Sequence, residues 1–124
     1  MNRIYEIIIS CIVMIVFDSI FLYSIKDISS KQILLIQNSP IKFKIVSAII
    51  CYIFMVFAVN YFIINQNKSI LDAFLLGLII YGIYESTNYT IFDKWTMKLA
   101  IIDTIWGGVL FAATTQFIYY IKKL

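Results

Sequence analysis

The chain has 124 residues, of which 62% are hydrophobic and 14% are charged, and its mean hydropathy is +0.91. A soluble domain averages about 45–50% apolar and about 25% charged residues, and one of this size could not bury so much apolar surface. The composition therefore excludes an ordinary water-soluble domain and predicts an all-α integral membrane protein, with residues 1–124 as a single transmembrane domain. The net charge of +3 is small, and the basic residues lie near the ends of apolar segments. This pattern excludes the basic face that a nucleic-acid-binding protein needs and leaves the lipid bilayer as the expected partner.

The chain contains two cysteines, Cys11 and Cys51, and no histidine. Both cysteines lie within apolar runs, where we expect them to act as small hydrophobic side chains. Without an imidazole, a serine or cysteine hydrolase couple is excluded. Zinc, haem and iron–sulfur centres are poorly supported for the same reason, and no cofactor is indicated.

Four apolar segments are long enough to cross a bilayer, which takes about 20 residues. They are predicted at residues 4–25, 43–64, 71–92 and 97–120. The first is too long for the apolar part of a signal peptide, about 7–15 residues, so we interpret it as a retained span. Because the connections are short, the four spans are predicted to form an up-down-up-down four-helix bundle in the membrane.

The connections carry helix-start signals. Residues 26–38 are too short to span the bilayer, and their apolar cluster predicts a short helix at the interface, with an ordinary loop as the alternative. Ser39 and Pro40 are predicted to open the second span, as N-cap and first helical residue. Ser69, followed by Asp72 three residues later, predicts a capping box at the start of the third span.

In this topology both chain termini lie at one membrane face, here called face A. The loops over residues 26–42 and 93–98 lie at the opposite face, called face B, and six of the ten basic residues lie near it: Lys26, Lys31, Lys42, Lys44, Lys94 and Lys98. The positive-inside rule therefore favours face B as the cytoplasmic side, in a cell membrane or in a viral or host membrane. Glu6 is predicted to reach the headgroups, and Trp95 is predicted to anchor the turn at the membrane interface.

Three carboxylates lie well inside the spans. Asp18, Glu85 and Asp103 belong to the first, third and fourth spans, each about two turns from face B. At a rise of about 1.5 Å per residue, all three are expected roughly 10 Å into the bundle. A carboxylate in hydrocarbon is costly, faces a partner or a wet cavity, and marks function. We therefore expect the three acids to face one another across the bundle.

Aromatic and polar residues accompany the acids. Tyr81, Glu85 and Asn88 share one stripe of the third span, and Trp106 lies three residues after Asp103 on the fourth. The candidate binding site is therefore Asp18, Tyr81, Tyr84, Glu85, Asn88, Asp103 and Trp106, with Tyr52 of the second span near the same level. Four glycines are predicted to let the helices approach closely: Gly77, Gly82, Gly107 and Gly108.

No lysine or arginine is expected at the depth of the acids to balance them. Because like charges away from water cannot all ionise side by side, some of the acids are protonated or a cation lies among them. Oxygen ligands alone favour a proton, sodium, magnesium or calcium. A metal, if one binds, would be held by Asp18, Glu85 and Asp103. The alternative is that the acids are neutral and hydrogen-bonded to nearby side chains, where they fix the packing of the helices.

A motif between Gly77 and Gly107 gives a resemblance to a known family. It reads Tyr81-Gly82-x-Tyr84-Glu85-x-Thr87-Asn88, then Trp95, then Asp103-x-x-Trp106-Gly107. The motif resembles the family called domain of unknown function 2177, which comprises small predicted membrane proteins of bacteria and large DNA viruses. Asp18 and Pro40 also correspond, so the resemblance covers most of the chain. The chain departs from the family pattern at Glu85, where the family has aspartate, and at Ser86 and Thr90. The resemblance implies the fold and the site, and it implies no activity.

Three functions fit these features. The first is transport or binding of a proton, cation or small solute by the intramembrane acids, for which the narrow four-helix core leads us to expect a homo-oligomer. The second is a structural or assembly protein, viral or cellular, in which the acids hold helices together. The third is a membrane enzyme acting on a lipid or apolar substrate, with the acids as general acid and base. The missing histidine and the lack of a catalytic motif count against the enzyme.

Overall fold

The computed structural model describes residues 2–124. Its elements, in order, are α1 (Arg3–Ser24), α2 (Lys26–Gln37), α3 (Ile45–Val59), the π-helical turn η1 (Asn60–Ile64), α4 (Ile70–Ile91) and α5 (Met97–Lys122). Four helices are long and apolar enough to cross a membrane: α1, α3 continued by η1, α4 and α5. The expected all-α membrane bundle is confirmed, and residues 26–37 form the short helix and not the loop.

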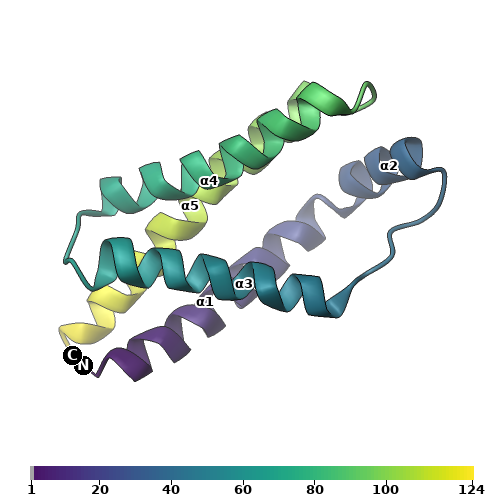
Figure 1. The fold of residues 1–124 in the computed structure, drawn as a ribbon. Helices are drawn as coiled ribbons and strands as arrows, with labels where there is room; N and C mark the ends of the chain where they lie inside the picture. Colours follow the sequence, from purple (N-terminus) through teal and green to yellow (C-terminus); the bar gives the residue numbers. More distant parts are fainter. Residues whose placement is uncertain (1) are drawn as a thin grey trace.

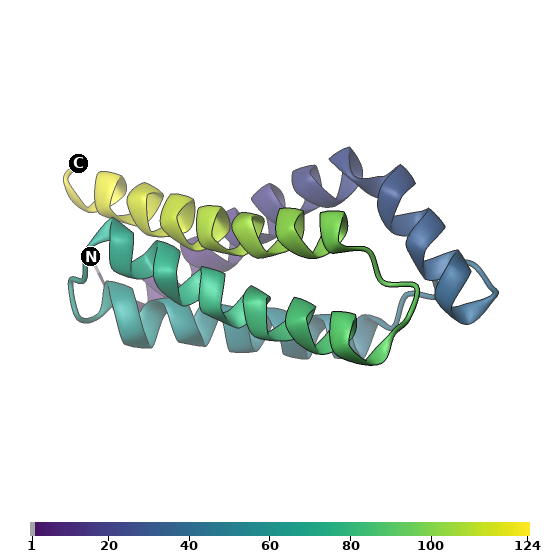
Figure 2. The same cartoon turned by 90° about the horizontal axis from the view of Figure 1, so that it is seen from above.

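The helices form two pairs (Figure 1). Helices α4 and α5 are an antiparallel hairpin with the most extensive packing in the molecule, while α1 packs on α5 and α3 packs on α1. The N- and C-termini lie together at face A, and α2 branches from α1 at the opposite end. Figure 2 shows that α2 and the turn between α4 and α5 both lie at that end, face B.

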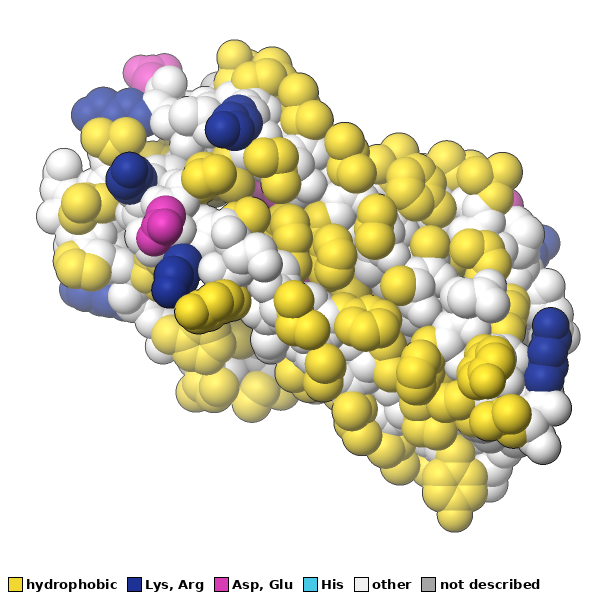
Figure 3. Space-filling view, turned by 180° about the vertical axis from the view of Figure 1, so that it is seen from behind, with side chains coloured by type: hydrophobic (Ala, Val, Ile, Leu, Met, Phe, Trp, Pro, Cys, Tyr) yellow, Lys and Arg dark blue, Asp and Glu magenta, His cyan; other side chains and the backbone are white. Residues whose placement is uncertain are grey.

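The surface is divided along the length of the bundle. Charged side chains gather at the two ends, and a broad apolar belt lies between them (Figure 3). Large apolar residues are exposed along every span; examples are Ile12 on α1, Phe54 on α3 and Ile83 on α4. Because exposed apolar surface of this extent is costly in water, the belt is the part that contacts lipid.

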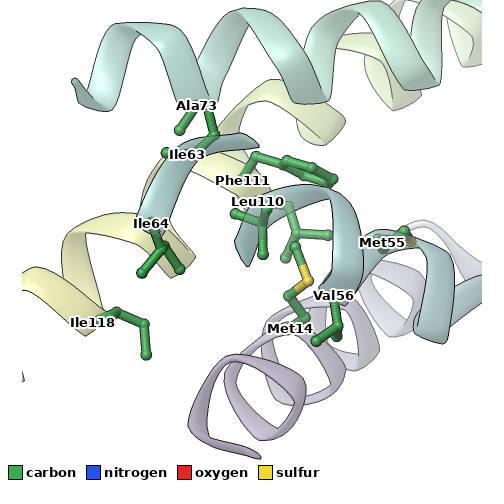
Figure 4. Close-up of a cluster of buried hydrophobic side chains, with 10 residues drawn as sticks. Met14, Met55, Val56, Ile63, Ile64, Ala73, Leu110, Phe111 and Ile118 are labelled. Carbon is green, nitrogen blue, oxygen red and sulfur yellow. The ribbon is translucent and has the colours of Figure 1, made fainter. Parts of the chain in front are cut away.

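The buried apolar core occupies the middle of the bundle and its face-A half. One cluster of buried apolar side chains contains Met14 of α1, Met55 and Val56 of α3, and Leu110 and Phe111 of α5 (Figure 4). Met14, Leu110 and Phe111 are completely inaccessible to solvent. Close packing of this kind fills the centre of the bundle, while a cavity of about 660 Å³ lies between α1 and the α3–η1 segment in the same half.

Glycines set the distance between α4 and α5. A Cβ atom at Gly77 would collide with the carbonyl oxygen of Gly107, and one at Gly108 would lie 2.7 Å from the ring of Phe74. These glycines therefore allow the close approach that the sequence predicts. The prediction is wrong for Gly82, where an added Cβ would lie 3.5 Å from its nearest neighbour, the Thr104 methyl group, at ordinary contact distance.

The helix starts confirm one prediction and correct another. The Ser69 hydroxyl accepts a hydrogen bond of 3.0 Å from the Asp72 backbone N–H, as the capping box requires. Ser39 and Pro40 do not open the second span, because the chain stays non-helical until Lys44 and α3 begins at Ile45. Gln37 explains the delay, since its side-chain amide donates to the carbonyl oxygens of both Ser39 and Pro40 and holds this segment as a turn after α2.

The prediction for Glu6 is also wrong. Its side chain does not reach outward but is buried, with one oxygen 2.9 Å from Nζ of Lys122. The up-down-up-down order brings the first turn of α1 beside the last turn of α5, so these two residues meet at face A. This ion pair joins the two ends of the chain.

Candidate functional site

A cavity of about 660 Å³ lies in the face-B half of the bundle. Its size is within the range of small-molecule sites, about 300–1,000 Å³. All three acids line it: Asp18 from α1, Glu85 from α4 and Asp103 from α5. Most of the other lining residues are apolar or aromatic: Leu22, Ile25, Ile33, Ile50, Cys51, Phe54, Met55, Ile80, Tyr81, Tyr84, Trp95 and Leu99, with Ser29 and Ser47. We call this space the acid cavity.

Asp18 is held by neutral donors on both carboxylate oxygens. Trp106 donates from Nε1 to Oδ1 at 2.9 Å, and the Tyr52 hydroxyl donates to Oδ2 at 2.5 Å. The indole of Trp106 is itself fixed by stacking on Phe21, with ring centroids 4.6 Å apart. Asp18 therefore joins α1 to α3 and to α5, and its hydrogen-bonding capacity is largely occupied.

Glu85 is buried, with 3% of its surface exposed, and Trp95 donates from Nε1 to its Oε2 at 2.7 Å. The prediction that Trp95 anchors at the membrane interface is therefore wrong. The turn after α4 folds back, and the Trp95 backbone N–H bonds the carbonyl oxygen of Phe92. This turn places the indole inside the bundle, where it is 92% buried. The site residues predicted from the sequence do not include Trp95, although the family motif contains it.

Asp103 has a different environment. Asp103 of α5 and Glu85 of α4 line the cavity together, and their carboxyls are close enough to affect each other's charge. Within residues 2–124 the one ion pair is that of Glu6 and Lys122, so none of the three cavity acids is paired with a base. Two adjacent carboxyls in a low-dielectric site cannot both be ionised without a compensating cation. Glu85 and Asp103 thus form the part of the cavity in which a positive charge is missing.

Helix α2 forms the face-B wall of the cavity. Ile25, Ile33 and Ile36 pack on a small cluster of Trp95, Leu99 and Ala100. The side chain of Gln32, on the buried face of α2, accepts a hydrogen bond of 3.0 Å from the Thr96 backbone N–H. These contacts fasten α2 over the turn that carries Trp95.

The remaining candidate residues divide into two groups. Tyr81 and Tyr84 line the cavity with the acids, and Tyr84 is 58% exposed at its opening. Trp106 acts through Asp18, while Asn88 is buried on α4 and its side-chain nitrogen has no hydrogen-bond partner among residues 2–124. In this described part of the chain no three His, Cys, Asp or Glu side chains come close enough to hold a metal ion. The three acids therefore share a cavity without forming a three-ligand metal centre.

The family comparison covers both the fold and the site. The model of a family described as predicted membrane protein (DUF2177) matches residues 3–120, a stretch that includes every residue lining the acid cavity. Neither the curated proteins nor the solved structures contain a match. Because the match covers nearly the whole chain, this protein belongs to the DUF2177 family of predicted membrane proteins.

Proposed function

We propose that this protein binds a proton or a small cationic solute in the acid cavity and moves it across the membrane. The observation that carries the proposal is that three acids from three helices line one intramembrane cavity, while no lysine or arginine lines it. Charged groups inside a membrane are costly, and those that persist there mark ion and substrate pathways. A cavity of this charge attracts cations and repels anions.

The three acids have different roles in this proposal. Asp18 is bound by two neutral donors and positions α1, α3 and α5. Glu85 keeps one oxygen bonded to Trp95, and Asp103 faces Glu85 without an aromatic donor of its own. The pair of Glu85 and Asp103 is therefore the exchangeable part of the site, where a proton or a cationic group completes the hydrogen bonding.

The shape of the bundle supports a carrier more than an open channel. The acid cavity lies in the face-B half, and the packed core around Met14, Leu110 and Phe111 separates it from face A. A carrier exposes its site to one side at a time, so this arrangement fits a conformation in which the site is separated from face A. The excess of lysines near face B places that side in the cytoplasm in our proposal.

A flux measurement tests the proposal. The purified protein is reconstituted in liposomes, and the flux of H⁺, Na⁺ and K⁺ is followed under an imposed membrane potential. We expect a flux of at least one of these ions that is lost in Glu85→Gln and in Asp103→Asn. The control Asp93→Asn, in the exposed turn after α4, should retain it. The proposal would be contradicted if the ion flux of the native protein were no higher than that of Glu85→Gln and of Asp103→Asn.

The hydrogen bonds of Asp18 and Glu85 favour a second candidate, a structural role. Each of these acids has its own aromatic donor, which is the arrangement expected if the carboxyls only hold helices together. Asp103 and the cavity beside it have no part in that role. Under the structural candidate, Asp103→Asn leaves the biological function of the protein intact, so a complementation assay in the source cell separates the two.

A further inference from the structure

We infer that the acid cavity takes a single-chain amphiphile with a cationic head group, which enters sideways from the bilayer between α3 and α4. The inference rests on the proposed function, and it names the class of solute and the route. It starts from three features of the cavity: where it opens, how its lining is divided, and which charge it lacks.

The cavity opens toward lipid. Its wall on α3 is formed by Ser47, Ile50, Cys51, Phe54 and Met55, and α3 packs on α1 and makes little contact with α4. Phe54 is 70% exposed, and Tyr84 on the facing side of α4 is exposed as well. Figure 1 shows α3 and α4 diverging toward face B. Because this part of both helices belongs to the apolar belt, a molecule that passes between them comes from the membrane.

The lining has two parts of different chemistry. The acids and Trp95 form a polar end among α1, α4 and α5. The side toward α3 and α2 is lined mostly by apolar residues, among them Ile33, Ile50 and Phe54, together with Ser29 and Ser47. A small hydrated ion finds no ligands on that apolar surface, while an alkyl chain that arrives from the bilayer can lie against it and stay out of water. The lining therefore matches a molecule with a polar head and an apolar tail.

The charge of the polar end determines the head group. An anionic head would face Glu85 and Asp103 with no base to receive it, and a phospholipid would bring its phosphate to the same place. A cationic head supplies the charge that the two carboxyls lack. The exposed ring of Tyr84 and the indole of Trp95 border this end and offer faces on which a cation is favourable. A single-chain cationic amphiphile therefore matches both the apolar lining and the two carboxyls that lack a base.

Carbodiimide protection tests the inference. Dicyclohexylcarbodiimide modifies protonated carboxyl groups in apolar surroundings, and mass spectrometry of peptides reports the modification at Glu85 and Asp103. The protein in phosphatidylcholine nanodiscs is labelled with and without dodecyltrimethylammonium. Dodecanol and dodecanoate have the same chain with a neutral or an anionic head. At ten times its half-saturating concentration, the cationic amphiphile should lower the labelling of the pair about tenfold. The two controls should leave the labelling unchanged.

Two variants sharpen the test. Asp103→Asn keeps Glu85 available for labelling but removes half of the carboxyl pair, so protection should weaken strongly. Asp93→Asn, outside the cavity, should retain full protection. Equal protection by dodecanol would show that the cavity binds any alkyl chain, and it would overturn the inference. Full protection in Asp103→Asn, or no protection by any of the three compounds, would overturn it as well.

The outcomes also separate this inference from the proposed function. An ion flux that depends on Glu85 and Asp103, without protection by the amphiphile, would remove the amphiphile and leave the proposed function standing. Protection without any acid-dependent flux would leave a binding site and remove transport.

Discussion

The two halves of the bundle treat their buried acids differently. At face A, Glu6 is buried beside Lys122, and the helices around this ion pair enclose a packed apolar core. At face B, Asp18, Glu85 and Asp103 have neutral partners or one another, and a cavity lies between them. The same four helices thus build a face-A half in which the buried charge is balanced and a face-B half in which it is not.

The contrast shows which acids hold the structure and which are available for binding. A buried carboxylate with a lysine partner has its charge balanced inside the chain, so nothing further is needed. A pair of carboxyls without a base needs a proton or a cation from outside to balance its negative charge.

The largest effect is expected from Gly77→Ala, because the new methyl group would collide with the backbone carbonyl of Gly107, which cannot move aside as a flexible side chain can. Forcing α4 and α5 apart should cost about 3 kcal/mol, the upper end of typical overpacking costs. The matched control is Gly82→Ala on the same helix, where the added methyl group fits and the loss of stability should stay below about 0.5 kcal/mol. Thermal unfolding in detergent measures both, and equal losses would contradict the difference in packing.

Lys122→Met should lower stability by about 2 kcal/mol, because it leaves Glu6 buried without its partner while part of the lysine is solvent-exposed. The double variant Glu6→Gln with Lys122→Met should recover most of that loss, since no unpaired charge remains. Unfolding in mixed micelles measures the stability. The double variant should also keep the ion flux of the native protein, and a lost flux would mean that face A takes part in binding.

Trp95→Phe should lower stability by about 1.5 kcal/mol, because it removes the indole donor from the buried Glu85 carboxyl. It should also increase the carbodiimide labelling of Glu85, whose oxygen becomes free. Tyr52→Phe is the matched control: it removes a donor from Asp18 and should leave the labelling of Glu85 unchanged. Similar labelling in both variants would show that Trp95 does not control access to Glu85.

Asp103→Asn should change stability by less than about 0.5 kcal/mol, the range of substitutions that break no satisfied contact, since an amide can donate a hydrogen bond to Glu85. Its effect on ion flux should nevertheless be complete. The combination of an unchanged melting temperature and an abolished flux is the result that a purely structural role does not allow.

Much of this arrangement can be predicted from the sequence. Segment length and composition define the four membrane helices, and the shared depth of Asp18, Glu85 and Asp103 predicts the common cavity that they line. Asn88 of the Glu85 stripe is not among the residues that line the cavity, but Tyr81 of that stripe and Tyr84 beside it are. These predictions succeed because helix rise and topology are enough to set the depth of a residue.

The wrong predictions concern side chains that make contacts unusual for a residue at that place in a membrane helix or turn. A tryptophan at a span end usually marks the interface, and only the folded-back turn reveals that Trp95 binds Glu85. The same holds for the turn that Gln37 stabilises before α3. The pairing of Glu6 with Lys122 had a signal in the sequence, because the predicted topology already places both ends of the chain at one face.

The most direct test uses Cys51, which is exposed and lines the acid cavity. In a Cys11→Ser background, its modification rate is measured with a cationic and an anionic methanethiosulfonate reagent, each normalised to its rate with free cysteine. Acids without a compensating base should favour the cationic reagent by about tenfold or more, as cavity potentials of several kT do. Asp103→Asn should reduce that preference. Equal normalised rates, or no reaction with either reagent, would contradict a wet, acid-lined cavity.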